Sequence, residues 1–230
     1  MSDHVRLLCM RHAESENVTA RAAGALPHAR LTPTGHEQAA EAARRLAGES
    51  ITHVYASTAV RARQTAEIIG HALGLDGVVP LEGLTEMHAG RLEGSADPAV
   101  RVRVLETLRS WIVDGDLDAA AGDGEDGHAV TARTVAALTS IAAAHPGATV
   151  AVVGHVASLT AGLNALCGLG ARVWGGAAAA RGAVPRAVGR AVMAMRGMAG
   201  LNSSARGSRQ SSSSSTGPGG TTSAGPSPRR

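Results

Sequence analysis

The sequence is poor in aromatic residues and contains no lysine. Its 230 residues include no phenylalanine, one tyrosine and two tryptophans, although 44% of them are hydrophobic. Such a chain can bury a sizeable core, but that core must be packed from alanine, valine, leucine and isoleucine. Because all 22 basic residues are arginines, the chain also lacks the glycine-lysine loop with which Walker-type proteins bind phosphate.

Cysteines and long apolar runs are scarce, and this excludes further classes of protein. The two cysteines, Cys9 in an apolar strand and Cys167 on an apolar helix, are expected to be small buried hydrophobic residues, and their spacing fits neither a metal site nor a disulfide framework. No window reaches the about 18 uncharged apolar residues of a membrane span. Charged residues surround the short N-terminal apolar run, which argues against a signal peptide. We therefore expect a soluble, cytoplasmic protein with no membrane partner.

The basic character of the chain comes from its C-terminal part. The formal net charge is +3, but residues 1–170 hold 13 arginines and all 19 acidic residues, whereas residues 171–230 hold nine arginines and no acidic residue. A nucleic-acid-binding domain usually carries a basic stripe on a folded unit, and this distribution does not provide one. We therefore expect no specific nucleic-acid partner.

Strand and helix patterns alternate along residues 1–170, which we predict to form the folded domain. Short apolar runs predict strands over residues 5–10, 51–57, 78–84 and 148–155. Helix-forming residues predict helices over residues 34–47, 59–74, 97–112, 128–145 and 157–170. Thr34 is the predicted N-cap of the first of these helices. The alternation indicates an α/β fold, a three-layer sandwich in which helices flank a largely parallel central sheet.

After residue 170 the composition changes. Residues 171–202 form an Ala/Gly/Arg-rich extension, in which the single predicted element is an amphipathic helix near residues 186–198. Residues 203–230 are rich in Ser, Gly, Pro and Arg and hold too few apolar side chains to fold, so we predict a disordered tail. A shifted reading frame would produce the same loss of acidic residues.

Basic side chains follow three of the predicted strands. The first strand ends at Arg11 and His12, the second is followed by Arg61, and the last ends at His155. In open α/β sheets ligands bind beyond the carboxyl ends of the strands, so we expect these four side chains to converge. Two guanidinium groups and two imidazoles suit the oxygens of a phosphate dianion.

The same residue types select a reaction class. A neutral imidazole can attack phosphorus and form a covalent intermediate, and a nearby carboxyl group can protonate the departing alcohol oxygen. The sequence shows no cluster of aspartates for Mg²⁺ and no thiol nucleophile in a phosphate loop. These features predict metal-free phosphoryl transfer through a phosphohistidine.

Four segments, taken in order, resemble the motifs of a known family. They are "LLCMRHAESENV", "VYASTAVRARQTAEII", "LTEMHAGRLEG" and "VAVVGHVASL". Together they make the chain similar to the histidine phosphatase superfamily, also called phosphoglycerate mutase-like, over about residues 5–168. The resemblance implies the corresponding α/β fold and implies no metal and no cofactor.

The resemblance also implies catalytic roles for individual residues. His12 is implied to be the nucleophile, held in one tautomer by a backbone carbonyl near the strand end. Arg11, Arg61 and His155 are implied to hold the phosphoryl oxygens as the bond breaks. Glu86 is implied to be the acid for the leaving group and then the base for the hydrolytic water.

Three further residues are implied to lie near the substrate. Asn17 occupies a position from which family members often contact the phosphate. His88 is expected to line the substrate entrance, or else to be an ordinary exposed loop histidine. Glu125, in the segment "GDGEDGH", is expected to help order the pocket.

The chain departs from the family pattern at several places. Ala13 and Val156 stand where the family usually has a glycine after each histidine, which should crowd the pocket slightly. Family members continue past the last helix into another strand. Nothing after residue 170 has that pattern, so we expect the sheet to lack an edge strand.

The predicted activity is that of a phosphoric monoester hydrolase acting on a small phosphorylated metabolite. The near alternative is a cofactor-dependent mutase of the phosphoglycerate type. Mutases usually carry longer inserts between the two final motifs, and the short spacing from Glu86 to His155 therefore favours hydrolysis. A third alternative is a non-catalytic protein that binds phosphate, or one recruited through its basic tail. The identity of the ester and the oligomeric state are left open.

Overall fold

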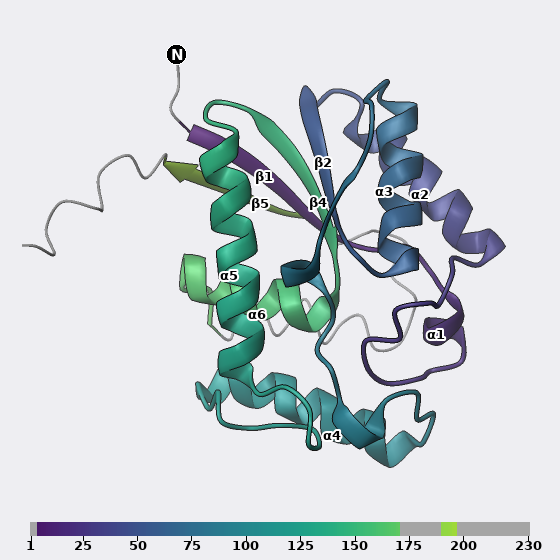
Figure 1. Cartoon of the computed structure of the whole chain (residues 1–230), viewed down its shortest axis with the longest axis vertical. Coiled ribbons are helices and arrows are strands. Elements are labelled where there is room, and N and C mark those ends of the chain that lie inside the picture. The colour runs from purple at the N-terminus through teal and green to yellow at the C-terminus, as the bar shows by residue number, and fades with distance from the viewer. Residues whose placement is uncertain (1–3, 171–189, 197–230) are drawn as a thin grey trace, which may run out of the picture. The chain divides into compact units, whose positions relative to one another are not determined.

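The computed structural model describes residues 4–170 and 190–196 (Figure 1). These residues belong to one compact unit, Met1–Gly197, and the second unit, Met198–Arg230, lies outside the described residues, as does the tail predicted over 203–230. Within the described part of the chain, no helix is both long and apolar enough to cross a bilayer.

A single five-stranded sheet organises the unit, with the strand order β3-β2-β4-β1-β5. The strands are β1 (His4–Arg11), β2 (Ile51–Ser57), β3 (Val79–Leu81), β4 (Thr149–Gly154) and β5 (Arg190–Arg196). Strands β1 to β4 pair in parallel, and β5 pairs with β1 in the antiparallel direction. The prediction of an α/β fold with a largely parallel sheet is confirmed.

Helices cover both faces of this sheet (Figure 1). The helices are α1 (Glu16–Thr19), α2 (Pro33–Leu46), α3 (Val60–Ala72), α4 (Pro98–Arg109), α5 (Gly127–Ala144) and α6 (Val156–Cys167). Short 3₁₀ turns span Glu82–Leu84 and Gly90–Leu92, and a π-helical turn, Ser110–Asp114, continues α4. Helices α2 and α3 pack on one face of the sheet, whereas α5 and α6 pack on the other.

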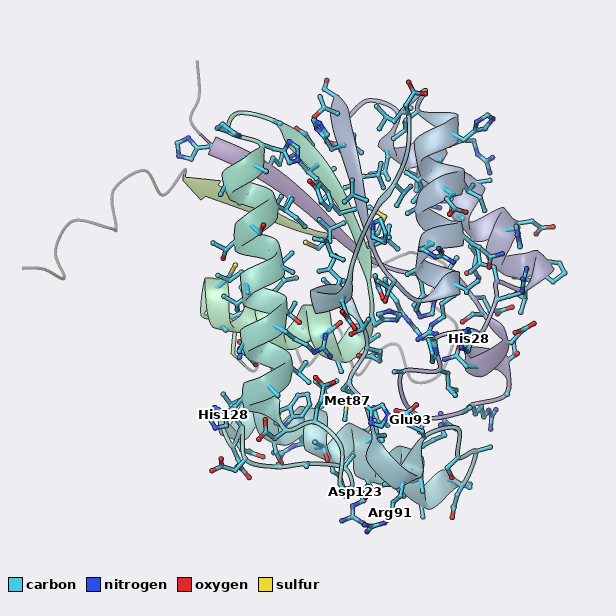
Figure 2. The ribbon with its side chains drawn as sticks, viewed as in Figure 1. His28, Met87, Arg91, Glu93, Asp123 and His128 are labelled. Atoms are coloured by element: carbon cyan, nitrogen blue, oxygen red, sulfur yellow. The ribbon has the colours of Figure 1, made fainter. Side chains whose placement is uncertain are left out.

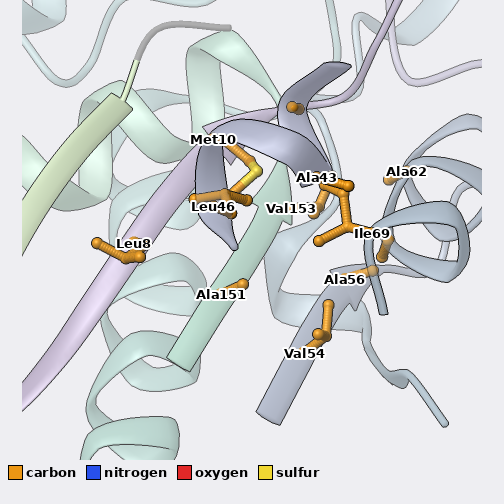
Figure 3. Close-up of a cluster of buried hydrophobic side chains, with 12 residues drawn as sticks. Leu8, Met10, Ala43, Leu46, Val54, Ala56, Ala62, Ile69, Ala151 and Val153 are labelled. Atoms are coloured by element: carbon orange, nitrogen blue, oxygen red, sulfur yellow. The ribbon is translucent and has the colours of Figure 1, made fainter. Parts of the chain in front are cut away.

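The alternation of side chains along β1 separates the core into two clusters, because successive residues of a strand point to opposite faces. Leu7 and Cys9 pack with residues of α5 and α6. Leu8 and Met10 pack with residues of α2 and α3, in the cluster drawn in Figure 3. With apolar residues buried on both faces, β1 and β4 are continuous hydrophobic runs, as expected of central parallel strands.

A third cluster lies away from the sheet and joins α4 to α6. It is built around Trp111, which is almost fully buried and whose Nε1 donates to the Ala119 carbonyl at 2.8 Å. The cluster also contains Leu108 of α4, Ala157 of α6 and, from the loop after β3, Met87. Helix α4 therefore packs on a core that lies away from the sheet and that it shares with α6.

Two local predictions from the sequence are wrong. The N-cap of α2 lies two residues earlier than expected, since it is Thr32 rather than Thr34, and the Oγ1 of Thr32 accepts from the Gly35 N–H at 3.0 Å. Pro33 occupies the first helical position, where its missing N–H costs nothing. Cys167 is exposed, although Cys9 is buried and burial raises the pKa of its thiol to about 12.

The largest correction concerns the C-terminal part of the sheet. Of the amphipathic helix predicted near residues 186–198, the part that the structure describes, Arg190–Arg196, is instead strand β5. β5 pairs with β1 from His4↔Arg196 to Met10↔Arg190, so the expectation of a missing edge strand is also wrong. The sheet thus draws on residues within the segment 171–202, which the sequence separated from the domain.

Candidate active site

The carboxyl ends of β1 and β4 lie next to each other and bring two histidines together. Arg11 is paired with Gly154, and the His12 N–H donates to the Gly154 carbonyl at 3.0 Å. The ring centroids of His12 and His155, which follow these strands, are therefore only 5.0 Å apart. Both rings are buried, at 6% and 1% exposure.

The hydrogen bonds of His12 define its tautomer. Its Nδ1 lies 2.7 Å from the carbonyl oxygen of Ala13, which can only accept, so the proton is on Nδ1. Its Nε2 accepts from Nε of Arg61 at 3.1 Å and keeps its lone pair directed toward the guanidinium. Burial, followed by the charges of Arg11 and Arg61, lowers the pKa of His12 well below its ordinary value. The imidazole is thus held neutral.

Arg61 links the two histidines to a loop. It is fully buried on α3, and it donates from Nη1 to the Leu26 carbonyl at 2.7 Å and from Nη2 to the Ala25 carbonyl at 2.8 Å. Nη2 also lies 3.2 Å from Nδ1 of His155. Burial lowers the pKa of Arg61 to about 10, so the guanidinium remains charged at neutral pH.

His155 is fixed in the complementary tautomer. Because Nδ1 accepts from Arg61, the proton lies on Nε2, which donates to Oγ of Ser57 at 2.8 Å. Burial is the largest cause that lowers the pKa of His155 well below its ordinary value, and neighbouring positive groups add to it. Ser57 ends β2, so three strand ends contribute to this network.

Glu86 reaches the site from the loop after β3, and its carboxylate lies at the N-terminus of α6. Oε1 accepts from the N–H groups of Met87 at 3.0 Å and Ser158 at 3.2 Å, and Oε2 accepts from the Ala157 N–H at 3.3 Å. The first-turn amides of a helix have no partner within the helix, so a carboxylate from another segment can satisfy them.

An ion pair between Arg133 of α5 and Glu125, just before that helix, holds the backbone of this loop. Arg133 donates from Nε to Oε1 of Glu125 at 2.7 Å and from Nη2 to Oε2 at 2.9 Å. The same guanidinium donates to the carbonyls of Gly83, Thr85 and Glu86. Glu125 also accepts from the His88 N–H at 2.9 Å. Sequence reasoning missed Arg133, because its partners are mostly backbone carbonyls distant in the sequence and leave no residue-type signal.

A cavity of about 290 Å³ opens above these groups. Arg11, His12, Arg61 and Glu86 line it, and Asn17 lies on its wall with its Oδ1 accepting from Ser15. These are five of the eight residues expected from the sequence to lie at or near the site. His155 lies behind the wall in the hydrogen-bonded network.

His88 is not part of this cavity. Its side chain is exposed, and its Nδ1 accepts from the N–H of Gly90 at 3.0 Å. The expectation that it lines the entrance is wrong, and the alternative of an exposed loop histidine describes it.

The outer wall of the cavity comes from residues without a sequence motif. Arg101, Val104, Leu105 and Leu108 line it from α4, and their spacing of three, four and seven residues places them on one helix face. Arg21 adds a further positive charge. In the sequence, only the helical spacing of these residues indicated this wall. Such spacing predicts that the residues share one face of a helix, but it does not predict that this face lines a cavity. Within the described residues, no group of three or more His, Cys, Asp or Glu side chains could hold a metal ion.

The two buried neutral histidines predict a pH dependence of stability. In the unfolded chain both would titrate near 6.5, whereas in the folded protein both pKa values are lowered. Below about pH 6.5 the unfolded chain therefore binds more protons, and the free energy of unfolding falls as the pH falls. Denaturant unfolding at pH 7.5 and 5.5 should differ by up to about 2–3 kcal/mol from this cause.

A double variant, His12→Gln with His155→Gln, is the control for this measurement. It should flatten the dependence between these two pH values, because the glutamines do not titrate. An unchanged dependence in the double variant would show that other groups cause it.

Comparison with known proteins agrees with this architecture. The histidine phosphatase superfamily (branch 1) matches residues 7–182. A protein of Serratia proteamaculans (strain 568) named probable phosphoglycerate mutase is 31% identical over 165 residues, which are 72% of this chain and 76% of the relative. The described fold superposes on Bacillus stearothermophilus YhfR with a TM-score of 0.61 at 28% identity, covering 70% of this chain and 79% of that one.

A second solved structure is a mycobacterial glucosyl-3-phosphoglycerate phosphatase, with a TM-score of 0.59 at 27% identity. The match covers 74% of this chain and 83% of that one. Phosphatases and a probable mutase are thus both among the relatives. The matched region includes every residue that lines the cavity. The chain therefore belongs to the histidine phosphatase superfamily, branch 1.

Proposed function

We propose that the chain is a phosphomonoesterase that hydrolyses a small phosphorylated metabolite, without a metal ion, through a phosphohistidine on His12. The observation that carries this proposal is the state of His12. Its neutral ring has the proton on Nδ1, and the lone pair of Nε2 lies at the cavity beside two guanidinium groups. A neutral nitrogen with positive charge around it can attack a phosphorus atom whose oxygens those charges hold.

In the first step the lone pair of Nε2 forms a bond to phosphorus, and the bond from phosphorus to the ester oxygen breaks. Glu86, in its protonated form, gives its proton to the departing oxygen, which leaves as the alcohol. Arg11 and Arg61 hold the phosphoryl oxygens as charge develops on them. To join them, His155, which lies behind the cavity wall, must exchange the hydrogen bond from its Nε2 to Ser57 for one to a phosphoryl oxygen. Arg61 must exchange its contact with Nε2 for one with a phosphate oxygen during this step.

In the second step a water molecule attacks phosphorus. Glu86 takes a proton from that water, the phosphorus–nitrogen bond breaks, and inorganic phosphate leaves with His12 neutral again. No other reactant is required. The part of the substrate beyond the phosphate would lie against α4, where Val104, Leu105 and Leu108 offer apolar surface.

A phosphoglycerate-type mutase is the second candidate, and the name of the Serratia relative favours it. Both reactions share the first step and differ in whether water or a hydroxyl group of a substrate takes the phosphoryl group. The cytoplasmic location remains a prediction from the sequence, as does the absence of nucleic-acid and membrane partners.

The test is a panel of phosphorylated metabolites incubated with the protein in EDTA, with inorganic phosphate measured. A parallel assay follows phosphoglycerate isomerisation in the presence of a bisphosphorylated primer. We expect phosphate release from at least one ester and isomerisation that is slower than release. Isomerisation without phosphate release would assign the protein as a mutase. If the folded protein catalyses neither reaction, the remaining function is phosphate binding without catalysis.

A further inference from the structure

Glu93 carries a cluster of backbone hydrogen bonds that the proposed mechanism does not use. Its Oε1 accepts from the N–H groups of Ala89 at 2.6 Å and Ala25 at 3.0 Å, and its Oε2 accepts from the Leu26 N–H at 3.4 Å. One carboxylate thus joins two segments more than 60 residues apart in the sequence. Figure 2 shows Glu93 near Met87, between the carboxyl edge of the sheet and α4.

The loop that Glu93 holds has an unusual backbone. Gly24 has a φ of +95°, and a Cβ atom there would collide with the Glu93 carboxylate. Leu26 has a φ of +35°, in a region of backbone conformation that residues other than glycine rarely adopt. Such a conformation persists only where its surroundings impose it. Glu93 supplies two of the contacts that do so.

The carbonyl groups of this same loop hold Arg61. Ala25 and Leu26 each donate an N–H to Glu93 and accept a guanidinium hydrogen bond through their carbonyl oxygens. The backbone of these two residues therefore connects the Glu93 carboxylate to the guanidinium that contacts Nε2 of His12. Burial lowers the pKa of Arg61, and the negative charges of Glu86 and, to a smaller extent, Glu93 act in the opposite direction.

From this geometry we propose that Glu93 is a positioning residue, which fixes the guanidinium of Arg61 against His12 through the backbone of Ala25 and Leu26. The proposal rests on the proposed function only in that Arg61 holds phosphate there. Glu93 does not line the cavity and does not itself meet the reacting atoms.

The experiment compares Glu93→Gln with Arg61→Met and with the double variant. Inorganic phosphate binding is measured by calorimetry in EDTA. We expect Glu93→Gln to weaken phosphate binding roughly tenfold, because a glutamine amide would meet the Leu26 N–H with a donor. In the Arg61→Met background the same change should have almost no further effect, as residues acting on one interaction are not additive. Glu41→Gln is the matched control, since the exposed carboxylate of Glu41 on α2 binds Arg44 and Arg45 and does not line the cavity.

The second readout is the ¹⁵N resonance of Nε2 of His12, which reports the hydrogen bond from Arg61 without any ligand or turnover. We expect its position in Glu93→Gln to move from the wild-type value toward that of Arg61→Met. A resonance that stays at the wild-type position, or effects of the two substitutions on phosphate affinity that multiply, would overturn the proposal.

These readouts separate the two hypotheses. A wild-type protein that binds no phosphate would count against the proposed function, whereas the His12 resonance would still decide the role of Glu93. If Glu93→Gln does not fold, Glu93→Asp keeps the charge and shortens the reach by one methylene. It should then shift the resonance in the same direction by a smaller amount, and an unshifted resonance would equally overturn the proposal.

Discussion

Replacing His12 with alanine is expected to lower the hydrolysis of p-nitrophenyl phosphate in EDTA by at least about 10³-fold. The substitution removes the neutral ring that lines the cavity, carries its proton on Nδ1 and directs the lone pair of Nε2 toward Arg61. The remaining positive groups can still bind phosphate, so the loss should fall on kcat more than on KM. Initial rates of the wild type and the variant, both shown to be folded by circular dichroism, provide the measurement.

His71→Ala is the matched control, because His71 is exposed near the end of α3 and lies outside the cavity. It should retain the wild-type rate. Rapid acid-free quenching with a ³²P-labelled ester should trap label on the wild-type protein and none on His12→Ala. Turnover in the His12 variant above about a tenth of the wild-type rate would rule out a nucleophilic role for this residue.

Ending the chain after Gly170 is expected to destabilise the fold by at least about 3 kcal/mol. That truncation removes β5, which pairs with seven residues of β1. Without β5, β1 becomes an edge strand with unpaired N–H and C=O groups, and such edges promote association with other chains. Since domains are stable by only about 5–15 kcal/mol, the truncated protein should unfold at lower denaturant concentration or aggregate.

The companion truncation ends after Gly197, at the boundary of the first compact unit. It keeps β5 and should match the full chain in denaturant midpoint. Equal stability of the Gly170 truncation and the full chain would mean that the pairing of β5 with β1 contributes little. Light scattering on both truncations separates association from unfolding.

The strand ends show why the centre of the site was predictable from the sequence. Apolar runs defined β1 and β4, and a parallel sheet brings the residues that follow such strands to one edge. That reasoning needed no knowledge of loops, and it placed His12 and His155 together. Arg61 was predictable for a similar reason, as it lies in the first turn of the helix after β2.

Arg133 and Glu93 show what the sequence could not reveal. Their hydrogen bonds go largely to backbone groups of segments about 50 to 70 residues away, and a backbone amide or carbonyl is the same whichever residue bears it. β5 was missed for a related reason. Its partner β1 lies earlier by 180 residues at Met10↔Arg190 and by more at every other pair. Composition describes the average character of a segment but not a distant pairing. Pro33, by contrast, was a usable signal for the start of α2 that the choice of Thr34 overlooked.

The separate core beneath α4 has a consequence for how this protein can change over evolutionary time. The groups proposed to carry out the chemistry depend on strand pairing and on the two clusters that flank the sheet. The wall that would meet the rest of the substrate depends on α4 and on the cluster around Trp111.

The chemistry also depends on this cluster, because Met87, which follows Glu86, and Ala157, whose N–H binds the Glu86 carboxylate, both belong to it. Neighbouring sites that share partners do not combine additively. Substitutions that redirect the choice of ester while the reaction is inherited unchanged are therefore expected at Arg101 and Leu105, which line the cavity from α4 without belonging to the cluster.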